Sequence, residues 1–117
     1  MPDYDSLCDK FKWENEFKNL ERLPGGGLNI AHEAVDRHAN SHLANTVALR
    51  WIRKDRSLID FTYSDLKIQT SQFANVLEKL AIKKNDSVFS LVGRIPYLYV
   101  AALGTLKTGA VFCPMFS

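Results

Sequence analysis

The stretch from residue 87 to residue 116 constrains the fold more than any other part of the chain. It begins with SVFSLVG, which has the β-branched and aromatic content of a buried strand. Pro96 then occupies the first position of a predicted helix over residues 97–108, which is apolar almost all round and ends at Gly109, a natural capping residue. The apolar strand AVFCPMF follows. Two strands joined by a helix predict a parallel β-α-β unit with a right-handed crossover.

One glycine lies inside the predicted crossover helix. Gly104 is in its middle, where glycine costs about 1 kcal/mol relative to alanine. We expect this glycine to permit a close approach of the helix to the sheet.

A β-hairpin and a second helix are predicted ahead of this unit. Residues 46–52, TVALRWI, alternate well enough for a strand, and a polar turn separates them from a second short strand, LIDFTY. Thr62 and Asp65 have the spacing of a capping box at the start of a helix that runs to about Leu80. The apolar stripe of this helix consists of Leu66, Phe73, Val76, Leu77 and Leu80.

The first 28 residues have a different character. Residues 3–21 mix apolar and charged side chains near helical spacing, which predicts a partly helical arm. Residues 24–27, Pro-Gly-Gly-Gly, interrupt regular structure and form a connector. Asn29 can then cap a helix that begins near Ile30.

These elements predict an α/β fold with two parts. Residues 1–28 form the N-terminal arm and its glycine-rich connector, and residues 29–117 form the body. The body is expected to be an incomplete doubly wound parallel layer, made of the hairpin and then the β-α-β unit. We expect the layer to be incomplete because a parallel strand needs neighbours at its edges and cover on both faces. The chain has too few elements left to provide them.

Two motifs look like known sites and fail on spacing. The triple glycine is not a phosphate-binding loop, because Leu28 and Asn29 follow it where lysine and serine or threonine are required. The string HEAVDRH differs from the zinc motif H-E-x-x-H, because Asp36 occupies the position of the second histidine. We therefore expect no metal site.

Composition excludes further classes of function. The net charge is only +2 and the basic residues are interleaved with acids, so no basic stripe is available for nucleic acid. The most apolar segment is far shorter than the roughly 20 residues of a membrane helix. The beginning of the chain does not resemble a signal peptide, and there are only two cysteines, far apart. We expect a cytoplasmic protein with no membrane or nucleic-acid partner.

From Asn29 onward, the order of motifs resembles the start of the AMP-forming acetyl-CoA synthetases, which belong to the adenylate-forming superfamily of AMP-binding enzymes. The resemblance covers roughly residues 13–117. Its stretches occur in order and at suitable spacing: LNIAHEAVDRHA (28–39), VALRWI (47–52), FTYSDL (61–66), FANVLEKL (73–80), DSVFSLVGRIP (86–96) and YVAALGTLKTGAVFCPMFS (99–117). The sequence departs from the family at Ala81 and Asn85, where glycines are frequent, and this predicts a slightly strained turn.

The resemblance implies an acetate–CoA ligase. Such enzymes use ATP and Mg²⁺ to activate a carboxylate as an acyl-adenylate, and they transfer the acyl group to the thiol of CoA. The glycine-rich phosphate loop and the late lysine of the family are absent here, so we assign no catalytic residue, no metal ligand and no cofactor to this chain. Phe116 and Ser117 match the first two positions of the segment near the CoA and acyl entrance, and they are the predicted CoA-binding residues.

We therefore expect the N-terminal portion of an acetyl-CoA or short acyl-CoA synthetase, inactive by itself, whose partner is the remainder of the synthetase chain. That remainder is either covalently continuous or associated by complementation. The absence of a polar tail after the last strand is the reason to expect a truncated domain. The alternative is a non-catalytic binding or interaction module, or the product of a decayed gene, that reuses the scaffold.

Overall fold

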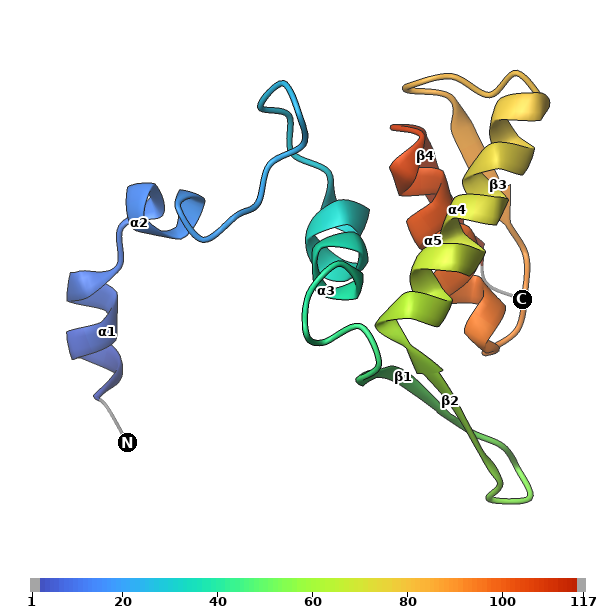
Figure 1. The fold of residues 1–117 in the computed structure, drawn as a ribbon, viewed down its shortest axis with the longest axis horizontal. Helices are drawn as coiled ribbons and strands as arrows, with labels where there is room; N and C mark the ends of the chain where they lie inside the picture. The colour runs from blue at the N-terminus through green and yellow to red at the C-terminus, as the bar shows by residue number, and fades with distance from the viewer. Residues whose placement is uncertain (1–2, 116–117) are drawn as a thin grey trace.

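The β-α-β unit forms as predicted in the computed structural model, which describes residues 3–115 (Figure 1). It consists of β3 (Ser87–Ser90), α5 (Pro96–Lys107) and β4 (Val111–Pro114). β3 and β4 pair in parallel. Gly109, at a φ of 77°, ends the crossover helix and leads into β4. The mixed α/β class is therefore confirmed.

The hairpin forms a sheet of its own. β1 (Val47–Ile52) and β2 (Leu58–Thr62) pair antiparallel, with an irregularity in the register between Val47 and Leu49. The described residues thus contain two separate two-stranded sheets, β1–β2 and β3–β4. The expected continuous layer is not confirmed, because the hairpin adds no strand to the parallel pair.

α4 (Tyr63–Lys79) connects the two sheets, and both of its ends follow from the sequence. The Asp65 amide donates to Thr62 Oγ1 at 3.1 Å and the Thr62 amide donates to Asp65 Oδ2 at 2.9 Å, so the predicted capping box is complete. At the other end, Ala81 has a φ of 61°. Alanine rarely adopts this left-handed conformation, which bears out the expected strain.

Gly104 allows a close approach, but to a helix and not to the sheet. A Cβ added to Gly104 would lie 2.8 Å from the Thr70 carbonyl oxygen and 2.9 Å from Cδ1 of Phe73, both on α4. The expectation of a helix-to-sheet contact was wrong. Because α5 is apolar nearly all round, its sequence does not reveal which neighbour it approaches.

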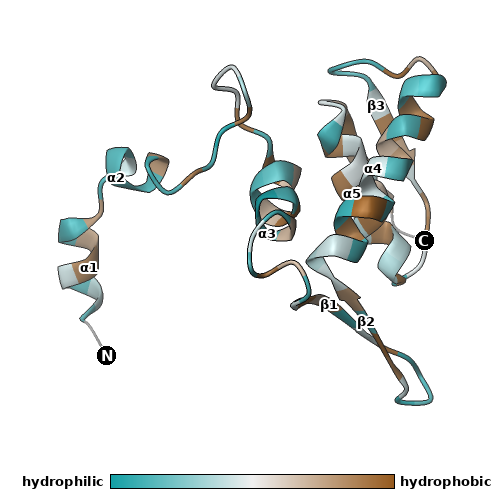
Figure 2. Cartoon of the chain, viewed as in Figure 1, coloured by the Kyte–Doolittle hydropathy of each residue, from teal (hydrophilic) through white to brown (hydrophobic). Residues whose placement is uncertain are grey.

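The core lies where α4, α5, the hairpin and a short helical segment meet. That segment is the π-helical turn η1 (His32–Asp36), continued by α3 (Arg37–Ala39). Val35, Leu66 and Val100 are buried together, and Ala48, Leu49, Phe61, Phe73 and Leu103 pack around them. Figure 2 shows brown apolar segments on the facing parts of these elements.

Polar contacts fix η1 to the helices. Asn29 Oδ1 accepts from the Ala31 amide at 2.9 Å, which confirms the predicted cap, and Asn29 Nδ2 donates to the Leu106 carbonyl at 2.8 Å. Lys107 Nζ donates to Asp36 Oδ1 at 2.6 Å in an ion pair that is largely shielded from solvent.

The N-terminal arm extends away from this body (Figure 1). It contains α1 (Tyr4–Lys10) and α2 (Trp13–Phe17), as the helical spacing predicts. Neither helix has a buried residue. The part of the chain that the structure describes contains no helix long and apolar enough to cross a membrane.

Candidate functional site

The candidate site lies at the carboxyl edge of the β3–β4 pair. Ser90 of β3 is in register with Pro114 of β4, and the Met115 amide donates to the Ser90 carbonyl at 2.8 Å. Both strands therefore end at the same edge of the sheet. Ligands of open α/β sheets bind beyond the carboxyl ends of the strands, so the fold points to this edge.

The connection from β3 to α5 leaves from this edge. The Ile95 amide donates to the Gly93 carbonyl at 2.9 Å, and Ile95 itself is extended, with φ −123° and ψ 157°. Pro96 follows at the first helical position, where its fixed φ suits the start of a helix. This local geometry fixes the beginning of α5 and leaves Arg94 exposed beside it.

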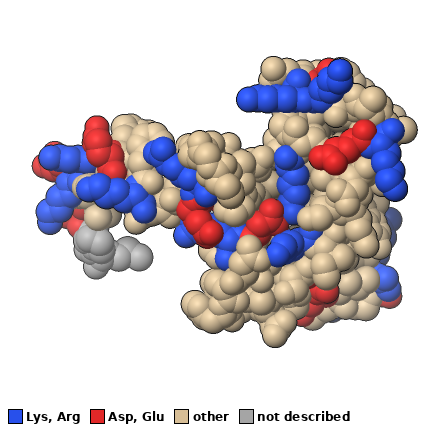
Figure 3. Space-filling model, turned by 45° about the horizontal axis from the view of Figure 1, so that its top comes forward, with Lys and Arg blue, Asp and Glu red and all other residues tan. Residues whose placement is uncertain are grey.

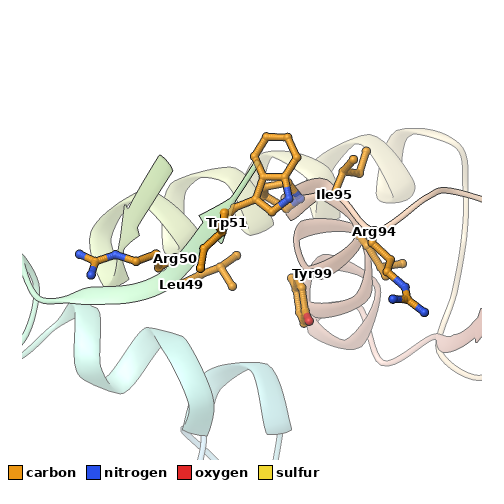
Figure 4. A pocket seen from close by; sticks show the side chains of 9 residues that line it. Leu49, Arg50, Trp51, Arg94, Ile95 and Tyr99 are labelled. Carbon is orange, nitrogen blue, oxygen red and sulfur yellow. The ribbon is translucent and has the colours of Figure 1, made fainter. Parts of the chain in front are cut away.

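A cavity of about 350 Å³ opens between β1 and the beginning of α5 (Figure 4). Leu49 and Trp51 of β1 form one wall, and Ile95 and Tyr99 belong to the other. A second cavity of about 250 Å³ shares Leu49 and Tyr99 with the first. Most of these walls are apolar, so they suit an apolar or aromatic group better than a phosphate.

The arginines near the cavity do not converge on it. Arg50 donates two hydrogen bonds of 2.7 Å to Asp60 on β2, and this ion pair lowers the pKa of the Asp60 carboxyl. Arg53 lies over the Trp51 ring, with its guanidinium carbon 5.3 Å from the ring centroid. In Figure 4, the guanidinium groups of Arg50 and Arg94 point to opposite sides. The arrangement is not a preformed anion site.

The histidines of the HEAVDRH string lie apart. His32 Nε2 is 4.0 Å from Glu21 Oε1, whereas the His38 ring lies against Tyr63, with 5.0 Å between the centroids. Within residues 3–115, no group of three or more His, Cys, Asp or Glu side chains is placed to hold a metal ion.

The predicted CoA-binding residues, Phe116 and Ser117, lie outside the described residues. Met115, the last described residue, is at the carboxyl edge itself. The sequence reasoning missed the cavity lined by Trp51 and Tyr99. Two signals were available: a tryptophan on the inward side of an alternating strand, and an apolar residue directly before the proline that starts α5.

Two parallel strands joined by a crossover helix, with a candidate site at their carboxyl edge, define an α/β protein of the open-sheet class. The sequence model of the AMP-binding enzymes matches residues 35–117. The chain belongs to this AMP-binding enzyme family.

Acetyl-CoA synthetases are similar to nearly the whole chain. The acetyl-coenzyme A synthetase of Bacillus subtilis is 34% identical over 119 residues, which cover 99% of this chain and 20% of that protein. The one from Methanothrix soehngenii is 36% identical over 117 residues, which cover 98% of this chain and 17% of that protein. The predicted resemblance is confirmed, and the chain spans about one fifth of the length of these relatives.

A solved structure extends the similarity to the fold. The crystal structure of an acyl-CoA synthetase from Brucella canis superposes with a TM-score of 0.87 at 31% sequence identity. The superposition covers 99% of this chain and 21% of that protein.

Proposed function

We propose that this chain is the N-terminal portion of an acetyl-CoA or short acyl-CoA synthetase. The complete enzyme would activate acetate with ATP to acetyl-AMP, release pyrophosphate, and transfer the acetyl group to the thiol of CoA. The superposition on an acyl-CoA synthetase over 99% of the chain is the observation that carries this proposal. The two free cysteines, Cys8 and Cys113, support a cytoplasmic location.

We propose that the chain alone is inactive, because its described residues do not fit the groups that the reaction needs. Gly25 and Gly26 adopt positive φ in a turn closed by a hydrogen bond from the Gly26 amide to the Leu23 carbonyl. A Cβ on either glycine would meet no atom within 4 Å, so this loop is an open connector and no phosphate cradle. Residues 3–115 likewise contain no group of three or more His, Cys, Asp or Glu side chains that could hold Mg²⁺. The chain would contribute scaffold, and at Phe116 and Ser117 the beginning of the CoA entrance.

A hybrid protein tests this proposal. In the hybrid, this chain replaces the aligned segment of the Bacillus subtilis acetyl-CoA synthetase. We expect acetate-dependent ATP–pyrophosphate exchange from the hybrid and none from the chain alone. A folded hybrid without exchange activity would contradict the proposal, and so would exchange by the isolated chain.

The exposed sheet favours a second candidate function, the non-catalytic interaction module. Phe89 is 65% exposed and Val111 is 47% exposed, and edge strands with such side chains can pair with another chain. A true module would be a defined monomer or oligomer with one cooperative unfolding transition. An isolated piece of a larger domain would aggregate or unfold without cooperativity.

A further inference from the structure

The N-terminal arm carries an uncovered row of apolar side chains. Trp13 and Phe17 are four residues apart in α2 and therefore lie on one side of that helix. Leu7 of α1 is four residues before Phe11, the extended residue that caps the end of α1. The Phe11 and Trp13 rings meet edge to face, with 5.1 Å between centroids, and join the two pairs. We call these four residues the arm ridge. Between 45% and 67% of each is exposed.

The two helices of the arm are too short to be stable by themselves. α1 has seven residues and α2 has five, whereas isolated helices shorter than about 12–15 residues are marginal in water. Most helical stability in proteins comes from packing an apolar face against another element. The arm ridge is such a face, and among the described residues nothing buries it.

Hydrogen bonds fix the base of the arm to the body. Arg37 Nη1 donates to the Asn19 carbonyl at 2.9 Å and to Glu33 Oε2 at 2.7 Å. The same Glu33 oxygen accepts from the Glu21 amide at 3.1 Å. In Figure 1, α3 lies between the arm and α4. These hydrogen bonds tie Asn19 and Glu21, at the end of the arm, to η1 and α3, whereas α1 and α2 extend away from α4 and α5 (Figure 1).

The arm lies outside the part of the chain that matches the AMP-binding enzyme family. The match to the AMP-binding enzymes begins at residue 35, so it omits the arm. The similarity to the Bacillus subtilis acetyl-CoA synthetase covers 99% of the chain and includes it. The superposition on the Brucella canis acyl-CoA synthetase also includes the arm, and it covers only 21% of that synthetase. An arm in this position is thus compatible with a much larger polypeptide around it.

We propose that the arm ridge is the docking surface for the polypeptide that completes the adenylate-forming domain, an inference that rests on the proposed function. These relatives are about five times as long as this chain, so the rest of such a protein is the occupant to which this proposal commits. Trp13 and Phe11 anchor the contact in an apolar depression of the partner. Residues 3–21 contain six acidic and three basic side chains, and Figure 3 shows the two signs interspersed on the arm. The excess of acidic residues would be matched by basic residues at the rim of that depression.

Amide hydrogen exchange of the arm tests the proposal. It is measured in the isolated chain and in the hybrid with the Bacillus subtilis synthetase, with the α4 amides as the reference for folding. We expect the amides of residues 4–17 to exchange at least about tenfold more slowly in the hybrid. The double substitution Phe11→Ala, Trp13→Ala should remove this protection and leave the α4 amides unchanged. Leu58→Ala, which alters an exposed leucine of the hairpin, is the matched control and should not affect the arm.

Arm amides that exchange equally fast in the isolated chain and the folded hybrid overturn the proposal. Protection that appears in the isolated chain as its concentration rises also overturns it, in favour of a second copy as the occupant. This concentration series is measured on the isolated chain, so its result does not depend on the hybrid. Failure of ATP–pyrophosphate exchange in a hybrid with a protected arm would count against the proposed function and not against the docking surface.

Discussion

Replacing Ala81 by glycine is expected to stabilise the protein. α4 ends in a Schellman motif, in which the Ile82 amide donates to the Leu77 carbonyl at 3.0 Å and the Ala81 amide donates to the Glu78 carbonyl at 2.9 Å. The motif requires a left-handed residue directly after the helix cap, and glycine usually fills that position. Here Ala81 fills it, at a φ of 61°.

The expected gain is the difference between two opposing terms. An L-residue in the left-handed conformation costs about 1–2 kcal/mol. Glycine avoids that strain, but it loses about 0.5–1 kcal/mol through its greater freedom in the unfolded chain. With the middle of each range, Ala81→Gly should therefore raise the free energy of unfolding by about 0.75 kcal/mol, between limits of about 0 and 1.5 kcal/mol. For a domain of this size, the midpoint of thermal unfolding should rise by about 2–6 °C.

Thermal and urea unfolding, followed by far-UV circular dichroism, measure this change in the hybrid protein. Ala74→Gly is the matched control, because Ala74 is a buried residue in the interior of the same helix. The Ala74→Gly variant should lose about 1 kcal/mol or more of its free energy of unfolding. The Ile82 amide, whose hydrogen bond closes the motif, should exchange more slowly in Ala81→Gly. A destabilising effect of Ala81→Gly, with Ala74→Gly behaving as expected, would refute the assignment of strain to Ala81.

Four further substitutions test the packing and the ionic contacts. Gly104→Ala should lower the free energy of unfolding by about 1–3 kcal/mol in urea titrations, because the added methyl group overlaps α4. Thr62→Ala should cost about 1 kcal/mol at neutral pH. Hydrogen bonds from Thr62 hold the pKa of Asp65 below its usual 3.8, so this carboxylate contributes stability above pH 3.8 and loses it as the pH falls through its folded-state pKa. Urea titrations over that pH range should therefore show the cost of Thr62→Ala shrinking with acidity, and a constant cost would contradict the coupling. Lys107→Met should destabilise by about 2–4 kcal/mol, because it leaves Asp36 shielded without a cation, and Asp36→Asn in the same protein should recover part of the loss in thermal unfolding.

The elements that the sequence predicted well have strong local signals. The capping box of α4 needs only Thr62 and Asp65, three residues apart, and both of its hydrogen bonds are present. The hairpin follows from alternating residues on either side of a polar turn, and the β-α-β unit follows from two apolar strands around a helix. Each of these patterns spans fewer than about 30 residues, which is the range over which chain geometry restricts the outcome.

The candidate site could be predicted only in part, because its walls come from distant segments. The carboxyl edge follows from the parallel pairing of β3 and β4. The cavity beside it requires Trp51 of β1 to face Ile95 and Tyr99, more than 40 residues later, and no local periodicity encodes that approach. The stripe of α4 shows the same limit, because Leu66 is 5% exposed whereas Val76 is 51% exposed. Helical spacing predicts a shared face, but burial also depends on which elements are present to cover it.

The contact between α4 and α5 explains why Gly104 was assigned to the wrong neighbour. Thr70 and Thr105 are both fully buried, and on an apolar helix pair two buried hydroxyls would suggest a hydrogen bond between the helices. Each hydroxyl instead donates to a carbonyl of its own helix at 2.7 Å, Thr70 to Leu66 and Thr105 to Ala101. The hydroxyls are thereby satisfied without a partner on the other helix, so the two backbones can approach as closely as Gly104 permits. Gly104 lowers the helix propensity of α5, but it makes room for Thr70 and Phe73 of α4. Only the three-dimensional pairing of the two helices shows this role.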